Sequence, residues 1–176
     1  MKYIPRDATI AITYKCNSRC RMCNIWQIED PAELPIEAFD NLSADLKYLN
    51  ISGGEPFLRT DLVEIVKRIN KSAPNAQIII SSNGLATELI EKTMKDIHTF
   101  DSRVGVRISI DGLNEMHDGV RGVPGIFDRA METMKRLKEI GLSNLGYSFT
   151  IMDKNVHQLK DVYEMSKKQG VELAMA

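Results

Sequence analysis

Short apolar runs alternate with helical patterns along the whole chain. The strand-like runs cover residues 9–14, 48–52, 77–81, 104–110, 146–152 and 171–174. They are short and rich in β-branched residues, as buried parallel strands are. Strands that alternate with helices predict a parallel sheet with right-handed crossovers.

Five stretches between these runs carry apolar residues at helical spacing. They are Phe39, Leu42, Leu46 and Leu49; Leu62, Ile65, Val66 and Ile69; Ile90, Met94 and Ile97; Ile126, Ala130, Met134 and Leu137; and Val156, Leu159 and Tyr163. The resulting (βα)₅β order predicts an α/β fold. A complete barrel of eight units needs ~250 residues, so 176 residues predict a partial barrel or a doubly wound sheet.

Composition excludes several classes of protein. No linker or composition break divides the chain, so residues 1–176 are expected to form one domain. A net charge of −1 gives no basic excess for nucleic acid or an anionic membrane. No apolar run approaches the ~20 residues of a membrane span, and charged residues near the N-terminus argue against a signal peptide. We therefore expect a cytoplasmic protein with no nucleic-acid or membrane partner.

The three cysteines lie within eight residues, as Cys16, Cys20 and Cys23, in the spacing C-x₃-C-x₂-C. An odd, clustered set argues against a disulfide framework and for a metal or redox site. A structural zinc ion needs four protein ligands, and no histidine stands in a spacing that suggests the fourth: His98, His117 and His157. A [4Fe–4S] cluster on three cysteines leaves one iron open to a substrate or cofactor. A zinc loop remains the alternative.

Polar and glycine-rich loops follow the other predicted strands. They contain Gly53 to Pro56, residues 82–84, residues 109–112 and residues 153–155. Since the carboxyl ends of parallel strands form the ligand face of such folds, these loops and the cysteine loop predict a single site. Gly53 and Gly54 leave bare backbone that a ligand can approach closely, and Glu55 could hold a cationic group.

Together these motifs resemble the radical S-adenosylmethionine (radical SAM) superfamily. The resemblance rests on C-x₃-C-x₂-C after the first strand, Gly-Gly-Glu-Pro at 53–56 and Ser-Ile-Asp-Gly at 109–112, and it covers nearly the whole chain. It implies a partial (β/α)₆-type parallel barrel, truncated at the sixth strand. It also implies two cofactors, a [4Fe–4S] cluster and S-adenosylmethionine.

The resemblance also implies roles for the cysteines and for the cofactors. Cys16, Cys20 and Cys23 would ligate three irons, and S-adenosylmethionine would chelate the fourth. One electron from the cluster would cleave the sulfonium and give a 5′-deoxyadenosyl radical, which abstracts hydrogen from a substrate. No catalytic residue is assigned beyond the cluster ligands.

Further positions that match the family pattern are expected to bind S-adenosylmethionine. Gly53, Gly54 and Glu55 would receive its amino group, and Arg121 is a candidate partner for its carboxylate, although a surface arginine is an alternative reading. The remaining positions would line the floor or contact the ribose, methionine or adenine portions: Ser81, Ser82, Asn83, Ser109, Asp111 and Ile151. Met22 stands where the family usually has an aromatic residue, and its thioether can pack against adenine. Trp26 either covers the cluster or is a partly buried loop residue.

The expected partners are a flavodoxin- or ferredoxin-type electron donor and an unidentified substrate, either a peptide or a small molecule. Ile25-Trp26 and the sequence Arg-Gly-Val-Pro-Gly at 121–125 resemble members that carry a C-terminal SPASM or Twitch domain. Two rival readings remain: a non-catalytic iron–sulfur or zinc module that binds a partner or senses redox state, and a trimmed core without substrate turnover.

Overall fold

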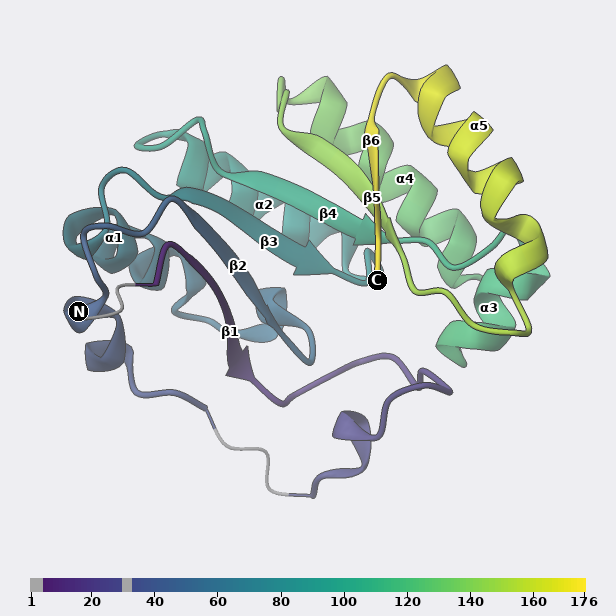
Figure 1. Cartoon of the computed structure of the whole chain (residues 1–176), viewed down its shortest axis with the longest axis horizontal. Helices are drawn as coiled ribbons and strands as arrows, with labels where there is room; N and C mark the ends of the chain where they lie inside the picture. The colour runs from purple at the N-terminus through teal and green to yellow at the C-terminus, as the bar shows by residue number, and fades with distance from the viewer. Residues whose placement is uncertain (1–4, 30–32) are drawn as a thin grey trace.

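The computed structural model describes residues 5–29 and 33–176, and its strands form one parallel sheet of six. The strands are β1 Asp7–Thr13, β2 Tyr48–Gly53, β3 Gln77–Ser82, β4 Gly105–Ser109, β5 Leu145–Phe149 and β6 Glu172–Met175. They lie side by side in chain order (Figure 1). A doubly wound sheet would reverse its strand order part-way. The order found here is that of a partial barrel.

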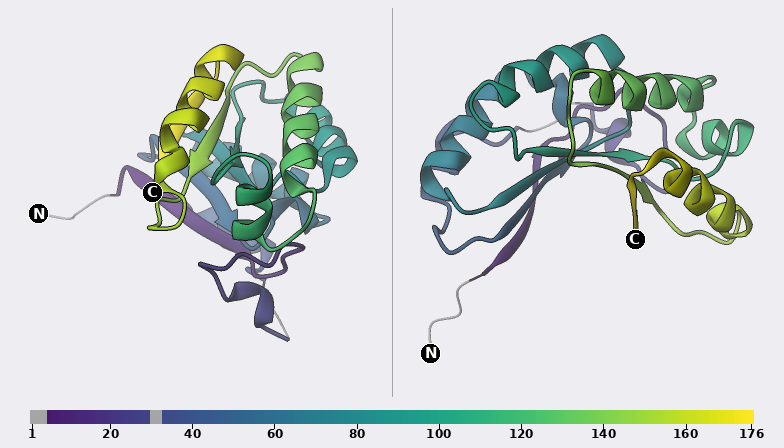
Figure 2. Two further views of the ribbon diagram at one scale, coloured as in Figure 1. Left: turned by 90° about the vertical axis from the view of Figure 1, so that its right-hand side faces the viewer. Right: turned by 90° about the horizontal axis from the view of Figure 1, so that it is seen from above.

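Helices follow the strands and cover one face of the arched sheet (Figure 2). They are α1 Leu62–Ser72, α2 Thr87–His98, α3 Glu115–Arg121, α4 Ile126–Glu139 and α5 Leu159–Gln169, with the 3₁₀ helices η1 Ile25–Gln27, η2 Ile36–Asn41, η3 Pro56–Leu58 and η4 Val156–Gln158. In the part of the chain that the structure describes, no helix is long and apolar enough to cross a membrane.

The two faces of the sheet differ in polarity. Side chains alternate between faces along each strand, and the face under the helices is apolar: Leu49, Ile51, Ile78, Ile80, Val106, Ile108 and Tyr147 are all buried. The opposite, concave face carries Asn50, Ser52, Ser81, Arg107, Ser109 and Ser148, which line a cavity. The strands are therefore buried on one face, and the opposite face is open to ligands.

The first predicted helix, over Phe39 to Leu49, is not formed. Phe39 belongs to η2, Leu49 to β2, and a turn at Ser43 separates them. The Ser43 hydroxyl accepts the Asp45 N–H (3.2 Å), and the Ser43 carbonyl accepts the Leu46 N–H (3.1 Å). Such local bonds compete with a helix. The stripe is apolar because these residues join the core from separate elements.

The last stripe predicts a helix correctly, but of its three residues only Leu159 packs against the core. Val156 lies in η4 and Tyr163 in α5, and both side chains are nearly half exposed. The buried positions of α5 are Val162 and Ser166. Val156 precedes α5, so only two residues of the stripe lie in the helix, and two residues do not determine which face is buried.

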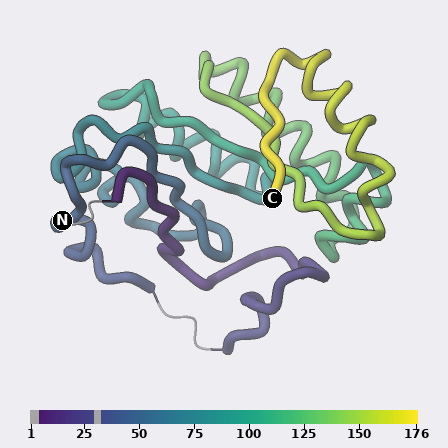
Figure 3. Tube along the Cα trace, viewed as in Figure 1, coloured from purple at the N-terminus to yellow at the C-terminus, as the bar shows by residue number. Residues whose placement is uncertain are grey.

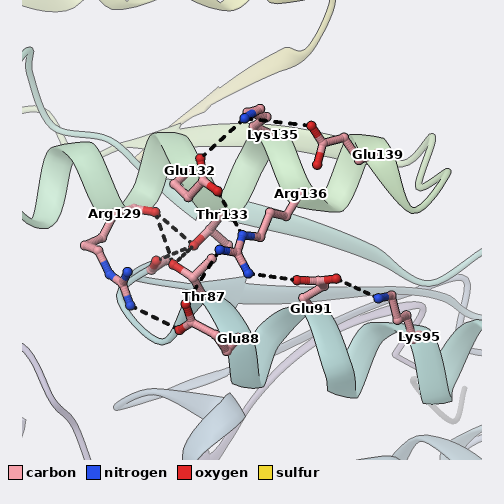
Figure 4. A network of polar contacts seen from close by, with 11 residues as sticks. Thr87, Glu88, Glu91, Lys95, Arg129, Glu132, Thr133, Lys135, Arg136 and Glu139 are labelled. Carbon is pink, nitrogen blue, oxygen red and sulfur yellow. Dashed lines mark hydrogen bonds and ion pairs between the residues drawn. The ribbon is translucent and has the colours of Figure 1, made fainter.

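Helices α2 and α4 are tied together by a polar network (Figure 4). Thr87 and Thr133 are buried and share a hydrogen bond of 2.8 Å. Around them Arg136 pairs with Glu91 at 3.2 Å and Arg129 with Glu88 at 3.1 Å. Exposed pairs of this kind contribute under about 1 kcal/mol each. The network therefore sets the register of the two helices, and the apolar core supplies most of the stability.

Candidate functional site

The three cysteines line one cavity of about 390 Å³, which extends from the carboxyl ends of the strands along the concave face. Most of the predicted site residues line the same cavity: Met22, Gly53, Gly54, Ser81, Ser82, Asn83, Ser109 and Arg121. Residues from five separate segments thus meet where the sequence predicts a single site. Three predicted residues are not among the lining residues: Glu55, Asp111 and Ile151.

The cysteine loop presents three free thiols. Cys20 is buried, Cys16 half-buried and Cys23 exposed. The buried Ser18 hydroxyl lies between two of them, 3.1 Å from the Cys20 Sγ and 3.6 Å from the Cys16 Sγ. Across residues 5–29 and 33–176, no three Cys, His, Asp or Glu side chains converge on one ion. A cluster needs no such convergence because each thiolate binds a different iron.

The three histidines lie outside the cavity. The His98 Nε2 is 3.0 Å from the Val104 carbonyl oxygen, and His157 belongs to η4. His117 lies in α3 and is fully buried; its Nδ1 accepts the Asp111 N–H at 2.9 Å. Burial lowers the pKa of His117 to about 3, so this imidazole is neutral. None of the three supplies a fourth ligand to the thiols.

The cysteine loop is clamped to the C-terminus of α3, a contact that the sequence does not reveal. The Arg19 N–H donates to the Arg121 carbonyl and the Arg21 N–H to the Val120 carbonyl, both at 2.9 Å. Gly122 caps α3 in the left-handed conformation (φ 69°), and a Cβ there would collide with the Arg19 carbonyl oxygen. In Figure 3 the loop runs from β1 to the end of this helix. Helix α3 thus positions Cys20.

We expect Gly122→Ala to push the cysteine loop off α3 and to lower the iron incorporated on reconstitution by about half or more. The added methyl group meets backbone, which cannot rotate away, and positive φ adds strain of about 1 kcal/mol. Gly125→Ala is the matched control, because Gly125 has φ 74° but open space at its Cβ position. Equal iron contents in the two variants would show that the close contact is unimportant.

The paired glycines after β2 lie against the chain that enters the cysteine loop. The Gly54 N–H donates to the Thr13 carbonyl and the Glu55 N–H to the Lys15 carbonyl, both at 2.8 Å. A Cβ at Gly53 would collide with the Thr13 carbonyl, and one at Gly54 with the Lys15 carbonyl. The glycines therefore bring the end of β2 to the residue that precedes Cys16.

Glu55 points into the protein and is fully buried. Its Oε1 accepts from the Ser82 hydroxyl (3.0 Å) and the Phe57 N–H (3.3 Å), and its Oε2 accepts from the Asn83 N–H (2.7 Å). Burial nevertheless raises the pKa of Glu55 to about 7, against the pull of these donors. The side chain ties the loop after β2 to the end of β3.

This raised pKa predicts a pH-dependent stability. The folded-state pKa of Glu55 lies above its ordinary value of 4.5. The contribution of Glu55 to stability therefore falls as the pH rises from about 4.5 to about 7, on the order of 3 kcal/mol in total. Glu55→Gln has no carboxyl group, so the difference in unfolding free energy between variant and wild type should move in the variant's favour over that range. Urea unfolding of the cofactor-free chain measures it.

Ser82→Ala serves as the control for this prediction. It removes one hydrogen bond to Glu55 but keeps the carboxyl group. It should therefore lower stability and preserve the slope of stability with pH. A Glu55→Gln difference that stays constant between pH 4.5 and pH 8 would contradict the raised pKa.

Asp111 and Arg121 form a buried ion pair beside the thiols. The Arg121 Nη2 lies 2.6 Å from the Asp111 Oδ2, and the Arg121 Nη1 donates to the Cys20 Sγ at 3.7 Å. The Asp111 Oδ1 accepts the Thr150 N–H at 2.7 Å, and its main-chain oxygen accepts from the Asn155 side chain. Burial raises the pKa of Asp111, and Arg121 opposes that rise. Asp111 thus holds the arginine that lines the cavity.

The remaining predicted residues differ in how they meet the cavity. The Asn83 side chain donates to the Asn17 Oδ1 at 2.7 Å and so joins the end of β3 to the cysteine loop. Met22 is exposed and lies between this cavity and a neighbouring one of about 930 Å³. Ile151 is not on the fifth strand, because β5 ends at Phe149, and its side chain is 46% exposed. Trp26 lines the cavity, half-buried, and its Nε1 donates to the Cys23 carbonyl at 2.9 Å.

Comparison with known proteins identifies the family. Residues 10–166 match the model of the Radical SAM superfamily, which is most of the chain. The chain belongs to the radical SAM superfamily. Enzymes of this family bind a [4Fe–4S] cluster and S-adenosylmethionine, and membership assigns both cofactors to this chain.

Curated relatives have several activities. The chain is 31% identical to a probable GTP 3′,8-cyclase of Methanocaldococcus jannaschii, over 94% of this chain and 56% of the relative. It is also 31% identical to the mycofactocin maturase MftC of Mycolicibacterium smegmatis, over 96% of this chain and 43% of the relative. The chain therefore spans about half the length of these curated relatives.

A solved structure shares the fold of the chain. SuiB of Streptococcus suis, bound to S-adenosylmethionine, superposes with a TM-score of 0.79 at 17% identity, over 98% of this chain and 40% of SuiB. At this identity the likeness concerns the fold, and it supports the partial barrel.

The residues present fit the two cofactors of the family. Three free thiols from one loop border the same cavity as the bare backbone of Gly53 and Gly54. The Arg121 Nε is buried without an acceptor among the described residues, and the Nη1 of the same guanidinium contacts the Cys20 Sγ. An unpaired buried donor of this kind calls for an acceptor, which an anionic ligand can supply.

Proposed function

We propose that this chain is a radical SAM core, a single domain over residues 1–176, that prepares S-adenosylmethionine for reductive cleavage. The observation that carries the proposal is the meeting of Cys16, Cys20 and Cys23 with Gly53 and Gly54 around one cavity. When bound, the cluster supplies the electron that cleaves the sulfonium and yields the radical that abstracts hydrogen from the substrate. The protein holds and orients both cofactors.

In this proposal the polypeptide recognises both charged ends of the methionine portion. Gly53 and Gly54 offer bare backbone to the amino group, and Glu55 fixes their loop from below, where it is buried. Arg121 lines the cavity and would meet the carboxylate, while Asp111 holds its Nη2. Ser82, Asn83 and Ser109 line the floor, and Met22 and Ile151 are proposed to flank the adenine.

The proposed partners are a one-electron donor of the flavodoxin or ferredoxin type and a substrate that is a peptide or a small molecule. SuiB has been solved with its precursor peptide SuiA, and a GTP cyclase is among the relatives, so both substrate classes occur in similar proteins. Three free thiols, one of them exposed, suit the reducing conditions of the cytoplasm.

Anaerobic reconstitution with iron and sulfide tests this function. We expect about four irons per chain and, with dithionite and S-adenosylmethionine, formation of 5′-deoxyadenosine and methionine. About four irons with no cleavage would favour a non-catalytic iron–sulfur module. One zinc per chain with no visible absorption would favour a zinc module.

A further inference from the structure

A second arginine lies on the concave face of the sheet. Arg107 of β4 lines the same cavity as the cysteines. Among the described residues that line this cavity, Arg107 and Arg121 are the only ones with formally charged side chains; the others are apolar, small polar or cysteine. An approaching substrate therefore meets two arginine side chains and no acidic side chain among these lining residues.

The two arginines differ in how their charges are compensated. Arg121 pairs with Asp111, whose side chain is fully buried. Arg107 pairs with Glu172 at 2.7 Å, but the Glu172 side chain is 78% exposed. An ion pair with so exposed a partner is weak because water and salt screen it. Glu172 can therefore give way to another anion.

The guanidinium of Arg107 is held in place by neutral groups. Its Nη1 donates to the Asn144 Oδ1 at 3.0 Å, and the Asn144 side-chain nitrogen donates in turn to the Arg103 carbonyl at 3.1 Å, which fixes the orientation of the amide. The Nε of Arg107 has no acceptor among the residues that the structure describes, and its Nη2 bonds only to Glu172. The edge formed by Nε and Nη2 matches the two oxygens of a carboxylate or phosphate.

A glycine makes room for this arginine. Arg107 pairs with Gly146 of β5, and Gly146 pairs with Glu172 of β6. A Cβ at Gly146 would lie 2.7 Å from the Arg107 Cδ and 2.8 Å from its Nε. The arginine thus lies flat across β5 toward β6. Any larger residue at position 146 would displace it.

We propose that Arg107 binds an oxyanion of the substrate, a carboxylate or a phosphate, and that Glu172 occupies this position until the substrate displaces it. Arg107 lies one inward-facing position before Ser109, toward the amino end of β4. A substrate held there would extend along the concave face toward the cysteine loop. That the bound anion belongs to a substrate rests on the proposed function. The anion site itself rests on Arg107, Gly146 and Glu172.

The test uses the full chain, ¹⁵N-labelled, with its thiols reduced and no iron or dithionite. Inorganic phosphate and acetate are titrated separately at constant ionic strength, and the backbone amide of Gly146 reports binding by NMR. Arg107→Gln should weaken the affinity for the preferred anion about tenfold. Glu172→Gln should strengthen it up to about fivefold, because it removes the competing carboxylate. Tighter binding of phosphate would indicate a phosphorylated substrate, and tighter binding of acetate would indicate a substrate that carries a carboxylate.

Arg103→Gln is the matched control, since Arg103 is a more exposed arginine paired with Asp101 and does not line the cavity. It should leave both affinities unchanged. Equal affinities in wild type, Arg107→Gln and Glu172→Gln would overturn the proposal. Glu172→Gln changes an exposed side chain, so it decides the question even if Arg107→Gln folds poorly. No step requires cleavage of S-adenosylmethionine, so failure here is distinct from failure of the proposed function.

Discussion

Replacing any one of Cys16, Cys20 and Cys23 by alanine is expected to abolish cluster formation and all cleavage of S-adenosylmethionine. The three thiols are free, come from one loop and border one cavity. No histidine of the described chain lines that cavity to replace a lost ligand. With two thiolates left, the cluster loses a whole iron ligand, and each thiolate is part of the free energy of metal binding. We expect iron content and 5′-deoxyadenosine formation to fall below about one tenth of wild type.

The fold itself should survive these three substitutions. The core consists of residues on the strands and helices, such as Ile51, Ile80 and Val106, which are fully buried and independent of the loop. Far-ultraviolet circular dichroism should therefore match wild type. Ser18→Ala is the control: Ser18 hydrogen-bonds to two of the thiols but is not proposed as a ligand, so this variant should keep most of its iron. A cysteine variant with full iron and full cleavage would refute the assignment.

Gly54→Ala should raise the dissociation constant for S-adenosylmethionine by about ten- to a hundredfold. Its Cβ would collide with the Lys15 carbonyl, and backbone that must move to relieve a collision costs about 1–3 kcal/mol. Lys15 precedes Cys16, so iron incorporation should fall as well. The sequence predicts that bare backbone at this glycine lets the ligand approach closely. The structure adds that it also seats the cysteine loop.

Gly119→Ala is the control for Gly54→Ala. Gly119 has open space at its Cβ position and lies in a helix, where alanine is favoured over glycine. It should bind iron and cofactor as wild type does. Calorimetry on the reconstituted proteins measures the affinity of each variant for S-adenosylmethionine. Unchanged binding in Gly54→Ala would contradict a role for the close contact with the Lys15 carbonyl.

The sheet could be predicted from the sequence because two independent patterns indicate its strands. Runs such as residues 77–81 are β-branched, and the runs that form β2 to β5 are each followed by a helix. The segment between β1 and β2 could not be predicted in this way. Phe39 and Leu46 are buried from a 3₁₀ helix and a turn, and their spacing imitates a helix. Periodicity reports burial, and burial does not require a regular element.

The members of the site were predictable from motifs, but their connections were not. Cys20, Gly54 and Asn83 each follow a strand, and strand ends meet at one edge. The contact between Arg19 and the end of α3 joins backbone atoms that are far apart in the chain. Such a contact cannot be predicted from residue types. Asp111 and Glu55 stand in ligand-binding motifs yet point inward, where they hold Arg121 and the end of β3. A motif gives the position of a side chain in the fold, and only tertiary packing gives its direction.

Electron paramagnetic resonance of the reduced, reconstituted chain, with and without S-adenosylmethionine, tests the central claim most directly. If three cysteines hold the cluster and leave one iron open beside Gly53 and Gly54, the cofactor contacts that iron. We then expect a [4Fe–4S]⁺ signal whose shape and g-values change when S-adenosylmethionine is added, and no such change in Gly54→Ala at the same cofactor concentration. A cluster signal that saturating S-adenosylmethionine leaves unaltered would contradict the account.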